Sequence, residues 1–504
     1  MRALLSPRAY SHAVDRVELI ETHISWVLLA GDRVYKVKKP VDLGFLDFTT
    51  LTRRRRFCRE EVRLNRRLTS DVYLGVVGIT GRPPRVRVGG RGRAIEVAVA
   101  MRRLPANRML DRLVRAGAAE PALLEAIGHV VARFHAGAAT GGEIDELAGL
   151  PTIHRNWAEN FEQTADFGEA LLRPAWRRQL RSYVDAFLDA GAARFAVRVA
   201  SGHARDCHGD LQAAHVCCVD PLQIFDCIEF NHRFRYADTA SEIAFLAMDL
   251  DRLGRPDLAM RFVNAYLEAS HDYDAVPLLD FYRAYRAFVR GKVLGFQAAA
   301  RPDAAREARD DFALAVRYTE PRVGARLLVT SGVVGSGKST VARALAARIG
   351  AIVVRTDAVR KHLAGVPLTA RTGAGLDQGL YAPEMGERTY AEAFRIAREL
   401  LGAGWSVVID GAFATAARRD AARRLARQAA APFTVLWCDA PDPVLAERLR
   451  RREGDPTEVS DAGAALLAAH RERYEAPAKE PDVVAIDTSR DTASLVERAV
   501  SRRA

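Results

Sequence analysis

The sequence predicts two domains, a mixed α+β domain followed by a doubly wound α/β domain with a parallel five-stranded sheet. The chain has 504 residues, which is long for one compact domain and natural for two. After residue 326, short apolar strands alternate with helices, and this alternation is typical of a parallel sheet covered on both faces. Before residue 318 there is no such alternation. The segment 319–326 contains a proline and a glycine at the change of pattern, so we expect the domain boundary there.

In the first domain, the expected elements are strands near the N-terminus and helices further on. Residues 31–32 form the turn of a hairpin, and the alternating pattern around them predicts its strands. The expected elements are strands within 24–48, a basic helix over 53–68, a turn-rich basic hairpin loop over 81–93, a strand over 94–104, mostly helix over 121–270 with a strand-and-loop block at 207–230, and helix over 276–318.

In the second domain, five short apolar segments read as the strands of the parallel sheet. Each is bounded by a helical pattern or a turn residue. They are RLLVTS (326–331), AIVVRT (351–356), WSVVID (405–410), FTVLWCD (433–439) and DVVAID (482–487).

The composition limits the classes of protein. Lys and Arg number 75 against 63 Asp and Glu, a net charge of +12, yet 49% of the residues are hydrophobic, so a disordered polycation is excluded. The arginines are scattered over the expected helices without interleaved aromatic residues, so a nucleic-acid partner is possible but not favoured. Six cysteines are too few for a disulfide scaffold, and we expect them to be reduced thiols.

The N-terminal segment does not resemble a signal peptide, because Asp15, Glu18 and Glu21 interrupt its apolar residues. No apolar run reaches the roughly 18 residues that a membrane helix needs. We therefore expect a cytoplasmic protein with no membrane contact. The sequence says nothing of the oligomeric state.

The first of the five strands runs into the sequence GVVGSGKST, which fits the P-loop pattern G-x-x-x-x-G-K-[ST]. Glycines let main-chain N–H groups turn toward phosphates, the following helix adds its positive end, and the lysine and serine serve the β/γ-phosphates and Mg²⁺. An ordinary glycine-rich turn would not need a preceding strand and a following helix. The predicted ATP-binding residues are Gly332, Gly335, Ser336, Gly337, Lys338, Ser339 and Thr340, with Lys338 also catalytic and Ser339 also a Mg²⁺ ligand.

Carboxylates follow two neighbouring strands at the edge where open α/β sheets bind ligands. Asp357 is a candidate to orient or deprotonate an acceptor hydroxyl, although it could instead cap its helix, and Asp410 is a candidate for the Mg²⁺ shell. Further on, Arg448, Arg451 and Arg452 precede a loop and could close over the γ-phosphoryl group as a lid. An arginine-rich solvated helix is the competing interpretation, and we single out Arg448 and Arg452 as catalytic candidates.

Residues 326–504 resemble the P-loop small-molecule and polynucleotide kinases, a group that includes gluconate kinase-like, zeta-toxin-like and 5′-polynucleotide kinase-like domains. The segments GVVGSGKST, RTDAVRK, VVIDGAF and RLRRRE carry this resemblance. It implies ATP-dependent phosphoryl transfer to a hydroxyl, with Asp357 as the candidate base. Motifs typical of mechanical AAA-type ATPases are not evident.

A second phosphotransferase pattern lies in the first domain. The sequence CHGDL is followed by IFD, which places Asp226 sixteen residues beyond Asp210. In kinases with this arrangement one aspartate accepts the hydroxyl proton and the other holds Mg²⁺. Upstream, Lys36 lies on an expected strand, with Lys38 as the alternative.

The helix after this strand offers a partner for the lysine. Glu60 and Glu61 lie at a suitable distance along the chain for the ion pair that fixes such a lysine, and Glu61 is our candidate. The strand 94–104 would then be the hinge whose main chain bonds adenine. The order of these five parts is more specific than the HGD sequence alone.

Residues 1–318 resemble the aminoglycoside phosphotransferase-like kinases, which implies a bilobal domain with an N-lobe over about 1–105 and a C-lobe over about 106–318. The whole chain looks like bacterial bifunctional proteins with an aminoglycoside phosphotransferase-like and an ATP-binding domain. The segments ETHISWVLL, VYKVKKPVDLGFLDF, CHGDL and IFDCIEFN carry the closer match. The resemblance does not establish an antibiotic as the substrate.

Two features depart from that family. His215 occupies the position where these kinases usually have a metal-binding Asn, and no G-x-G-x-x-G loop precedes Lys36. Imidazole is a poorer ligand for Mg²⁺ than an oxygen, so the predicted metal site of Asp226 and His215 is less secure, and Glu229 could supplement it or pair with an arginine. A zinc site from neighbouring cysteines and histidines fits no usual ligand spacing.

The sequence thus predicts an ATP- and Mg²⁺-dependent phosphotransferase with two kinase-like heads and a small-molecule hydroxyl acceptor. One alternative makes the first half a binding or regulatory module without turnover, as His215 suggests. Another makes the P-loop half a polynucleotide 5′-hydroxyl kinase.

Overall fold

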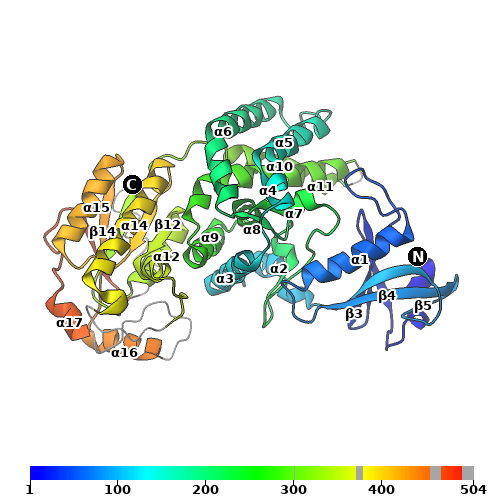
Figure 1. Ribbon diagram of the computed structural model, residues 1–504, viewed down its shortest axis with the longest axis horizontal. Coiled ribbons are helices and arrows are strands. Elements are labelled where there is room, and N and C mark those ends of the chain that lie inside the picture. The colour runs from blue at the N-terminus through cyan, green and yellow to red at the C-terminus, as the bar shows by residue number, and fades with distance from the viewer. Residues whose placement is uncertain (300, 371–377, 454–466, 491–504) are drawn as a thin grey trace. The chain divides into compact units, whose positions relative to one another are not determined.

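The computed structural model describes residues 1–299, 301–370, 378–453 and 467–490 (Figure 1). The chain forms two compact units. The first comprises residues 1–123, 134–253 and 281–318, and the second comprises 124–133, 254–280 and 319–504. The last change of unit coincides with the start of the predicted boundary segment, whereas two shorter segments before it also belong to the second unit. In the described part of the chain, every helix is too short or too polar to cross a membrane.

The first unit begins with a six-stranded antiparallel sheet in the order β1-β2-β3-β6-β4-β5. Residues 31–32 connect β2 to β3, as expected. Arg85–Val88 form a strand where only a loop was predicted, because Val86 and Val88 alternate with arginines and are buried. The strands are β1 (Val17–Glu21), β2 (Ser25–Ala30), β3 (Arg33–Lys38), β4 (Tyr73–Arg82), β5 (Arg85–Val88) and β6 (Ala94–Arg102).

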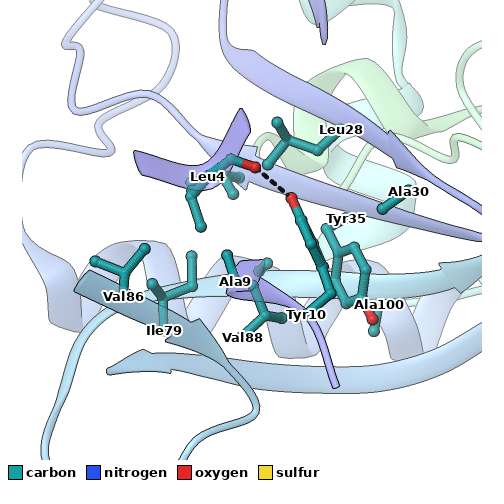
Figure 2. Close-up of a cluster of buried hydrophobic side chains, with 12 residues drawn as sticks. Leu4, Ala9, Tyr10, Leu28, Ala30, Tyr35, Ile79, Val86, Val88 and Ala100 are labelled. Atoms are coloured by element: carbon teal, nitrogen blue, oxygen red, sulfur yellow. Dashed lines mark hydrogen bonds between the residues drawn. The ribbon is translucent and has the colours of Figure 1, made fainter. Parts of the chain in front are cut away.

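Each face of this sheet is covered by a different part of the chain. On one face, Leu4, Ala9 and Tyr10 from the N-terminal turns pack with inward side chains of the strands, and the Tyr10 hydroxyl donates to the Leu4 carbonyl at 2.8 Å (Figure 2). On the other face, α1 (Leu51–Asn65) buries Cys58 and Val62 against β4 and β6. The sheet and α1 together fix the place of the side chains that enter the first site.

The rest of the first unit is mostly helical, with a strand-and-loop block where the sequence predicted it. That block spans 204–238 and carries four short strands. The elements of this part of the chain are α2 (Leu110–Arg115), α3 (Pro121–Gly137), α4 (Glu143–Ala148), α5 (Leu150–Gln163), α6 (Pro174–Ala200), β7 (Ala204–Asp206), β8 (Val216–Cys217), β9 (Gln223–Ile224), α7 (His232–Arg235), β10 (Tyr236–Asp238), α8 (Thr239–Arg252), α10 (Leu279–Gln297) and α11 (Pro302–Arg317).

The second unit contains the predicted parallel five-stranded sheet, in the order β12-β13-β11-β14-β15. The strands are almost entirely apolar and buried, as expected for a sheet covered on both faces. The elements are β11 (Leu327–Ser331), α12 (Lys338–Ile349), β12 (Ile352–Arg355), α13 (Thr356–Leu363), α14 (Pro383–Gly402), β13 (Val407–Asp410), α15 (Ala416–Gln428), β14 (Phe433–Asp439), α16 (Asp442–Glu453), α17 (Leu467–Glu472) and β15 (Val483–Asp487).

Helix α9 (Pro256–Ser270) packs beside the outermost strand, β12, of this sheet. The Asn264 side chain donates to the Ala351 carbonyl at 3.1 Å and accepts from the Val353 N–H at 2.8 Å. The Tyr273 hydroxyl donates to the Val353 carbonyl at 3.3 Å. Side chains from residues 254–280 therefore satisfy main-chain groups that β12 leaves open.

Candidate functional site

The predicted P-loop connects β11 to α12 in the second unit. Gly337 precedes the helix with a φ of 79°, and a Cβ atom at Gly332 would lie 2.3 Å from the Cys438 carbonyl oxygen. Both positions therefore require glycine. Lys338 begins α12, and its Nζ donates to the Val333 carbonyl at 2.7 Å, so the lysine side chain lies over the loop.

The remaining P-loop residues lie in the turn between β11 and α12 or in the first turn of α12. Gly335 has a φ of 80° and Ser336 is fully buried. Ser339 is half-buried in the first turn of α12 and Thr340 is exposed. The sequence analysis placed all of these residues in one phosphate-binding loop, and the structure brings them together at the positive end of one helix.

Asp410 ends β13, the strand next to β11, and is 3% exposed. Its Oδ1 accepts from the Thr330 hydroxyl at 3.1 Å, and its Oδ2 lies 3.7 Å from Arg355 Nε. Thr330 was not singled out in the sequence, because a threonine inside an apolar strand carries no signal of its own. It holds the carboxylate at the edge of the sheet where the P-loop begins.

Asp357 lies in the first turn of α13 rather than at its N-cap, which is Arg355. Its carboxylate is bonded to Arg360 at 2.6 Å. His470 on α17 faces the same region: burial and the charge of Lys338 lower the pKa of His470, and Asp357 opposes this shift. The sequence analysis did not identify His470.

Arg448 lies on α16 and supports the P-loop through Thr488. It donates to the Thr488 hydroxyl at 2.9 Å and to the Thr488 carbonyl at 2.6 Å, and the Thr488 hydroxyl donates to the Ser336 carbonyl. Arg451 is bonded to Glu447 on the same helix. The Arg452 side chain and the predicted lid loop, residues 454–466, lie outside the described residues.

In the first unit, Lys36 on β3 and Asp226 come together across 190 residues of sequence. Lys36 Nζ lies 2.5 Å from Asp226 Oδ1 and 3.0 Å from Glu61 Oε1. Burial opposes the charged form of Lys36, but the two carboxylates outweigh it and raise the pKa of the lysine. Burial likewise opposes ionised Asp226, but Lys36 and His215 lower its pKa. The charged pair is therefore the stable state.

Lys38, the alternative lysine, has a different environment. It is fully buried, and its Nζ is bonded to Glu61 Oε2 at 2.7 Å and to Glu229. Glu61 thus joins the two lysines, whereas Glu60 pairs with Arg63 on the surface of α1. Glu229 pairs with a lysine rather than with an arginine.

The HGD loop is held by residues that the sequence analysis missed. The buried carboxylate of Glu242 on α8 accepts from the Gly209 N–H at 2.9 Å and from the His208 N–H. Arg286 on α10 donates to the Gly209 carbonyl at 3.2 Å. These bonds fix the main chain immediately before Asp210.

The side chains of Asp210 and Asp226 lie on either side of His215. His215 Nδ1 is 3.4 Å from Asp210 Oδ2, and its Nε2 is 3.7 Å from Asp226 Oδ2. The Gln212 amide donates to both oxygens of Asp210, at 3.1 and 3.2 Å. The structure therefore brings together all the residues predicted for the first site: Lys36, Glu61, Asp210, His215 and Asp226.

The donor atoms bear on whether either site suits Mg²⁺, which prefers oxygen ligands. In the first unit, the Asp210 and Asp226 carboxylates offer oxygens and His215 offers a nitrogen. In the second unit, the Ser339 hydroxyl and the Asp410 carboxylate are oxygen donors. Both sets offer carboxylate oxygens of the kind that a hard cation prefers, and the second contains oxygen donors alone.

These observations define a protein with a P-loop nucleotide-binding domain in its second unit. Residues 327–477 match the family model of the AAA domain (AAA_33). Over 457 residues the chain is 36% identical to the proteins Rv2004c of Mycobacterium tuberculosis and Mb2027c of Mycobacterium bovis, an alignment that covers 90% of this chain and 90% of each relative. The chain therefore belongs to the family of these mycobacterial proteins, whose names state no activity.

Solved structures similar to parts of the chain include three kinases. A gluconokinase from Sinorhizobium meliloti is 26% identical, covering 36% of this chain and 92% of that chain, with a TM-score of 0.26. The Mycobacterium tuberculosis APS kinase CysC is 20% identical, covering 36% and 97%, with a TM-score of 0.27. A choline/ethanolamine kinase family protein from Mesorhizobium loti is 12% identical, covering 62% and 89%, with a TM-score of 0.37.

Proposed function

We propose that the protein is an ATP- and Mg²⁺-dependent phosphotransferase with two kinase-like heads, residues 1–318 and 326–504. Each head transfers the γ-phosphoryl group of ATP to a hydroxyl of a small molecule. The observation that carries this proposal is the convergence of Lys36, Glu61, Asp210 and Asp226 in a unit separate from the P-loop. A single nucleotide site would not require this second set of charged residues.

In the first head, Lys36 binds nucleotide phosphates and Glu61 fixes its position. Asp210 accepts the proton of the acceptor hydroxyl, whose oxygen forms a bond to the γ-phosphorus while the bond from that phosphorus to the β,γ-bridging oxygen breaks. The products are ADP and a phosphate ester. Asp226 would hold Mg²⁺, which neutralises phosphate charge, with Asp210 and His215 nearby.

In the second head, the P-loop main chain and Lys338 bind the phosphates, and Arg448 holds the loop through Thr488. Ser339 and Asp410 would hold Mg²⁺. Asp357 is the proposed base; it lies in the first turn of α13, and its carboxylate accepts a hydrogen bond from Arg360. Arg452 stays a candidate on sequence grounds.

A second candidate function follows from His215, which lies between the two aspartates of the first site. An imidazole at a position that offers an amide oxygen in related kinases weakens the metal site. The first unit would then be a nucleotide- or substrate-binding module that regulates the P-loop head.

Single variants of the full chain separate these functions. ADP release from ATP is measured with a panel of sugars, polyols and hydroxy acids as acceptors, for Asp210→Asn, Lys338→Ala and the double variant. We expect each single variant to lose the turnover of its own head, about 10²- to 10⁴-fold for removal of a general base. Asp189→Asn, an exposed residue of α6, is the matched control and should have no effect.

The outcomes are distinct. If Asp210→Asn changes nothing and Lys338→Ala abolishes all turnover, the first unit is a binding module. If both single variants retain full turnover, neither proposed site is catalytic.

A further inference from the structure

A cavity of about 1110 Å³ opens beside Asp210 in the first unit. Its walls come from α5, α7, α10 and the segment 43–45, and they are largely apolar and aromatic, including Phe45, Phe281 and Tyr285. A cavity of this size and composition suits a small organic molecule. Lys36 and Asp226 are not among its lining residues, so the cavity lies on the acceptor side of Asp210.

The charged side chains of the lining indicate the charge of the molecule that fits. Of its carboxylates, Glu159 is paired with Arg233 through two bonds of 2.7 Å, and Asp238 with Arg198 through bonds of 2.8 and 2.7 Å. Such bidentate pairs leave the carboxylates little capacity for another cation. Asp210 is the carboxylate of the lining that has no arginine in contact among the described residues.

Lys292 on α10 lines the cavity, and neutral side chains accept hydrogen bonds from its ammonium group. Its Nζ donates to Asn160 Oδ1 at 2.6 Å and to Gln163 Oε1 at 2.7 Å, and within the described part of the chain no carboxylate oxygen lies within ion-pair distance. Asn160 is 3% exposed, so the amide that holds the ammonium group is fixed in the core of the unit. Lys292 itself is half-buried. A half-buried cation with no carboxylate in ion-pair contact favours an anion beside it.

The position of Lys292 along α10 sets the size of the molecule. Arg286 donates to the carbonyl of Gly209, next to Asp210, and Arg290 donates to Gln212, which bonds Asp210. Lys292 follows Arg290 by two residues and Arg286 by six, or about 3 to 9 Å along the helix axis. A single molecule of the size of a sugar acid or a sugar phosphate spans that distance.

We propose that the acceptor of the first head is a small hydroxylated anion, with its hydroxyl at Asp210 and its carboxylate or phosphate group at Lys292. This inference rests on the proposed function of the first unit. A polycationic aminosugar would require several unpaired carboxylates in the cavity, whereas two of the lining carboxylates, Glu159 and Asp238, are paired with arginines. The phosphorylated product carries the new ester on that hydroxyl, and the displaced proton goes to Asp210.

Equilibrium binding to the full chain tests the charge of the acceptor without requiring turnover. Calorimetry with the Lys338→Ala chain and a non-hydrolysable ATP analogue compares four probes: gluconate and glucose 6-phosphate as anions, glucose as the neutral match, and kanamycin as the polycation. We expect an anion to bind at least tenfold more tightly than glucose, and the comparison of the two anions distinguishes a carboxylate from a phosphate.

Variants at Lys292 assign the anion to this cavity. Lys292→Gln should abolish the preference for the anion, Lys292→Arg should keep it, and the exposed Lys479→Gln is the matched control. Lys292 also joins α10 to α5, so a variant at this position could unfold the unit. Thermal melting of each variant, together with the Lys292→Arg chain, distinguishes loss of binding from loss of folding. Tight binding of kanamycin, binding of neither anion, or an anion preference that survives Lys292→Gln each overturns the proposal.

The pH dependence of the same binding gives a further check. Burial lowers the pKa of Lys292 to about 8, while Glu159 on α5 raises it and Arg233 on α7 lowers it. The lysine is charged below that pH, so anion affinity should be full at pH 7 and fall as the pH rises through about 8. The turnover of the Asp210→Asn chain tests the proposed function of the first unit. These binding results test only the charge of the acceptor.

Discussion

The two candidate phosphate sites of this protein are built in opposite ways. In the second unit, nine consecutive residues, 332–340, form the site from the end of β11 into the first turn of α12, and main-chain geometry dominates it. In the first unit, side chains from four distant segments form it, and Lys36 and Asp226 meet across 190 residues. A site of contiguous main chain needs only one correct local fold, whereas a site of side chains depends on the packing of the entire unit.

The difference extends to the energetics. The first site places Lys36, Lys38, Glu61 and Glu229 in the interior, where each charge is tolerated only because an opposite charge contacts it. The P-loop has no comparable group of buried charges within the described residues. We therefore expect single side-chain changes to affect the stability of the first site more than that of the second.

The largest expected effect is at Lys38. Lys38→Met removes the cation that contacts both Glu61 and Glu229, which leaves Glu229 buried without its cation and Glu61 with Lys36 alone. We expect the first unit to lose about 3–5 kcal/mol of unfolding free energy, the range for breaking a buried ion pair. Hydrogen exchange resolved by peptide would show the loss in β3 and α1 and leave α12 unchanged.

Lys39→Met is the control for this change, because it alters the adjacent lysine. Lys39 pairs with Glu21, whose side chain is 60% exposed. Such a pair contributes about 0–1 kcal/mol, so this variant should fold with nearly normal stability. Equal effects of the two variants would contradict the role assigned to the buried cluster.

The matching change in the second site is Gly332→Ala. The added Cβ would meet the Cys438 carbonyl, so the P-loop must shift, at a cost of about 1–3 kcal/mol. Nucleotide affinity of the second head should fall at least tenfold, as fluorescent-nucleotide titration would measure in a Lys36→Met background, which removes the proposed nucleotide-binding lysine of the first head. Gly402→Ala, where nothing lies near the added atom, is the control and should bind normally.

The smallest effect is an opposite pH dependence of stability in the two units. Burial raises the pKa of Asp311 to about 7 in the first unit, so its contribution is full below pH 4 and is lost as the pH rises through 7. In the second unit, burial and His362 lower the pKa of His271 to about 4, so its contribution is full above about pH 6.5 and is lost as the pH falls.

Raising the pH from 4 to 7 should therefore destabilise the first unit and stabilise the second, each by roughly 1–3 kcal/mol. Peptide-resolved hydrogen exchange at three pH values would measure both slopes. Asp311→Asn should remove the slope of the first unit, and His271→Gln that of the second. Slopes of the same sign in the two units would refute the assignment.

The contrast between the sites also explains what the sequence could predict. The five parallel strands and the P-loop were predicted correctly because apolar runs, glycines and a lysine occur in one order along the chain. Strand β5 was not predicted and lies within the loop expected at 81–93. Two valines between arginines are too short an alternating pattern to indicate a strand. Lys36, Glu61 and Asp226 were predicted from their order, but the resemblance to kinases was needed to connect them.

Other residues could not have been identified, because their role exists only in the folded chain. Glu242 accepts from main-chain N–H groups of the HGD loop, and Thr330 donates to Asp410. Lys292 faces amide oxygens of a helix 129 or more residues away in sequence. No local pattern marks such residues, since each is an ordinary member of its own helix or strand.

Helix α9 has a consequence for any attempt to produce the P-loop domain by itself. A fragment that starts at residue 326 would lack Asn264 and Tyr273, and the outer side of β12 would then present open N–H and C=O groups. Exposed edge strands pair with strands of other molecules, so such a fragment should aggregate. A soluble P-loop fragment has to carry residues 254–280 with it, by fusion or by co-expression.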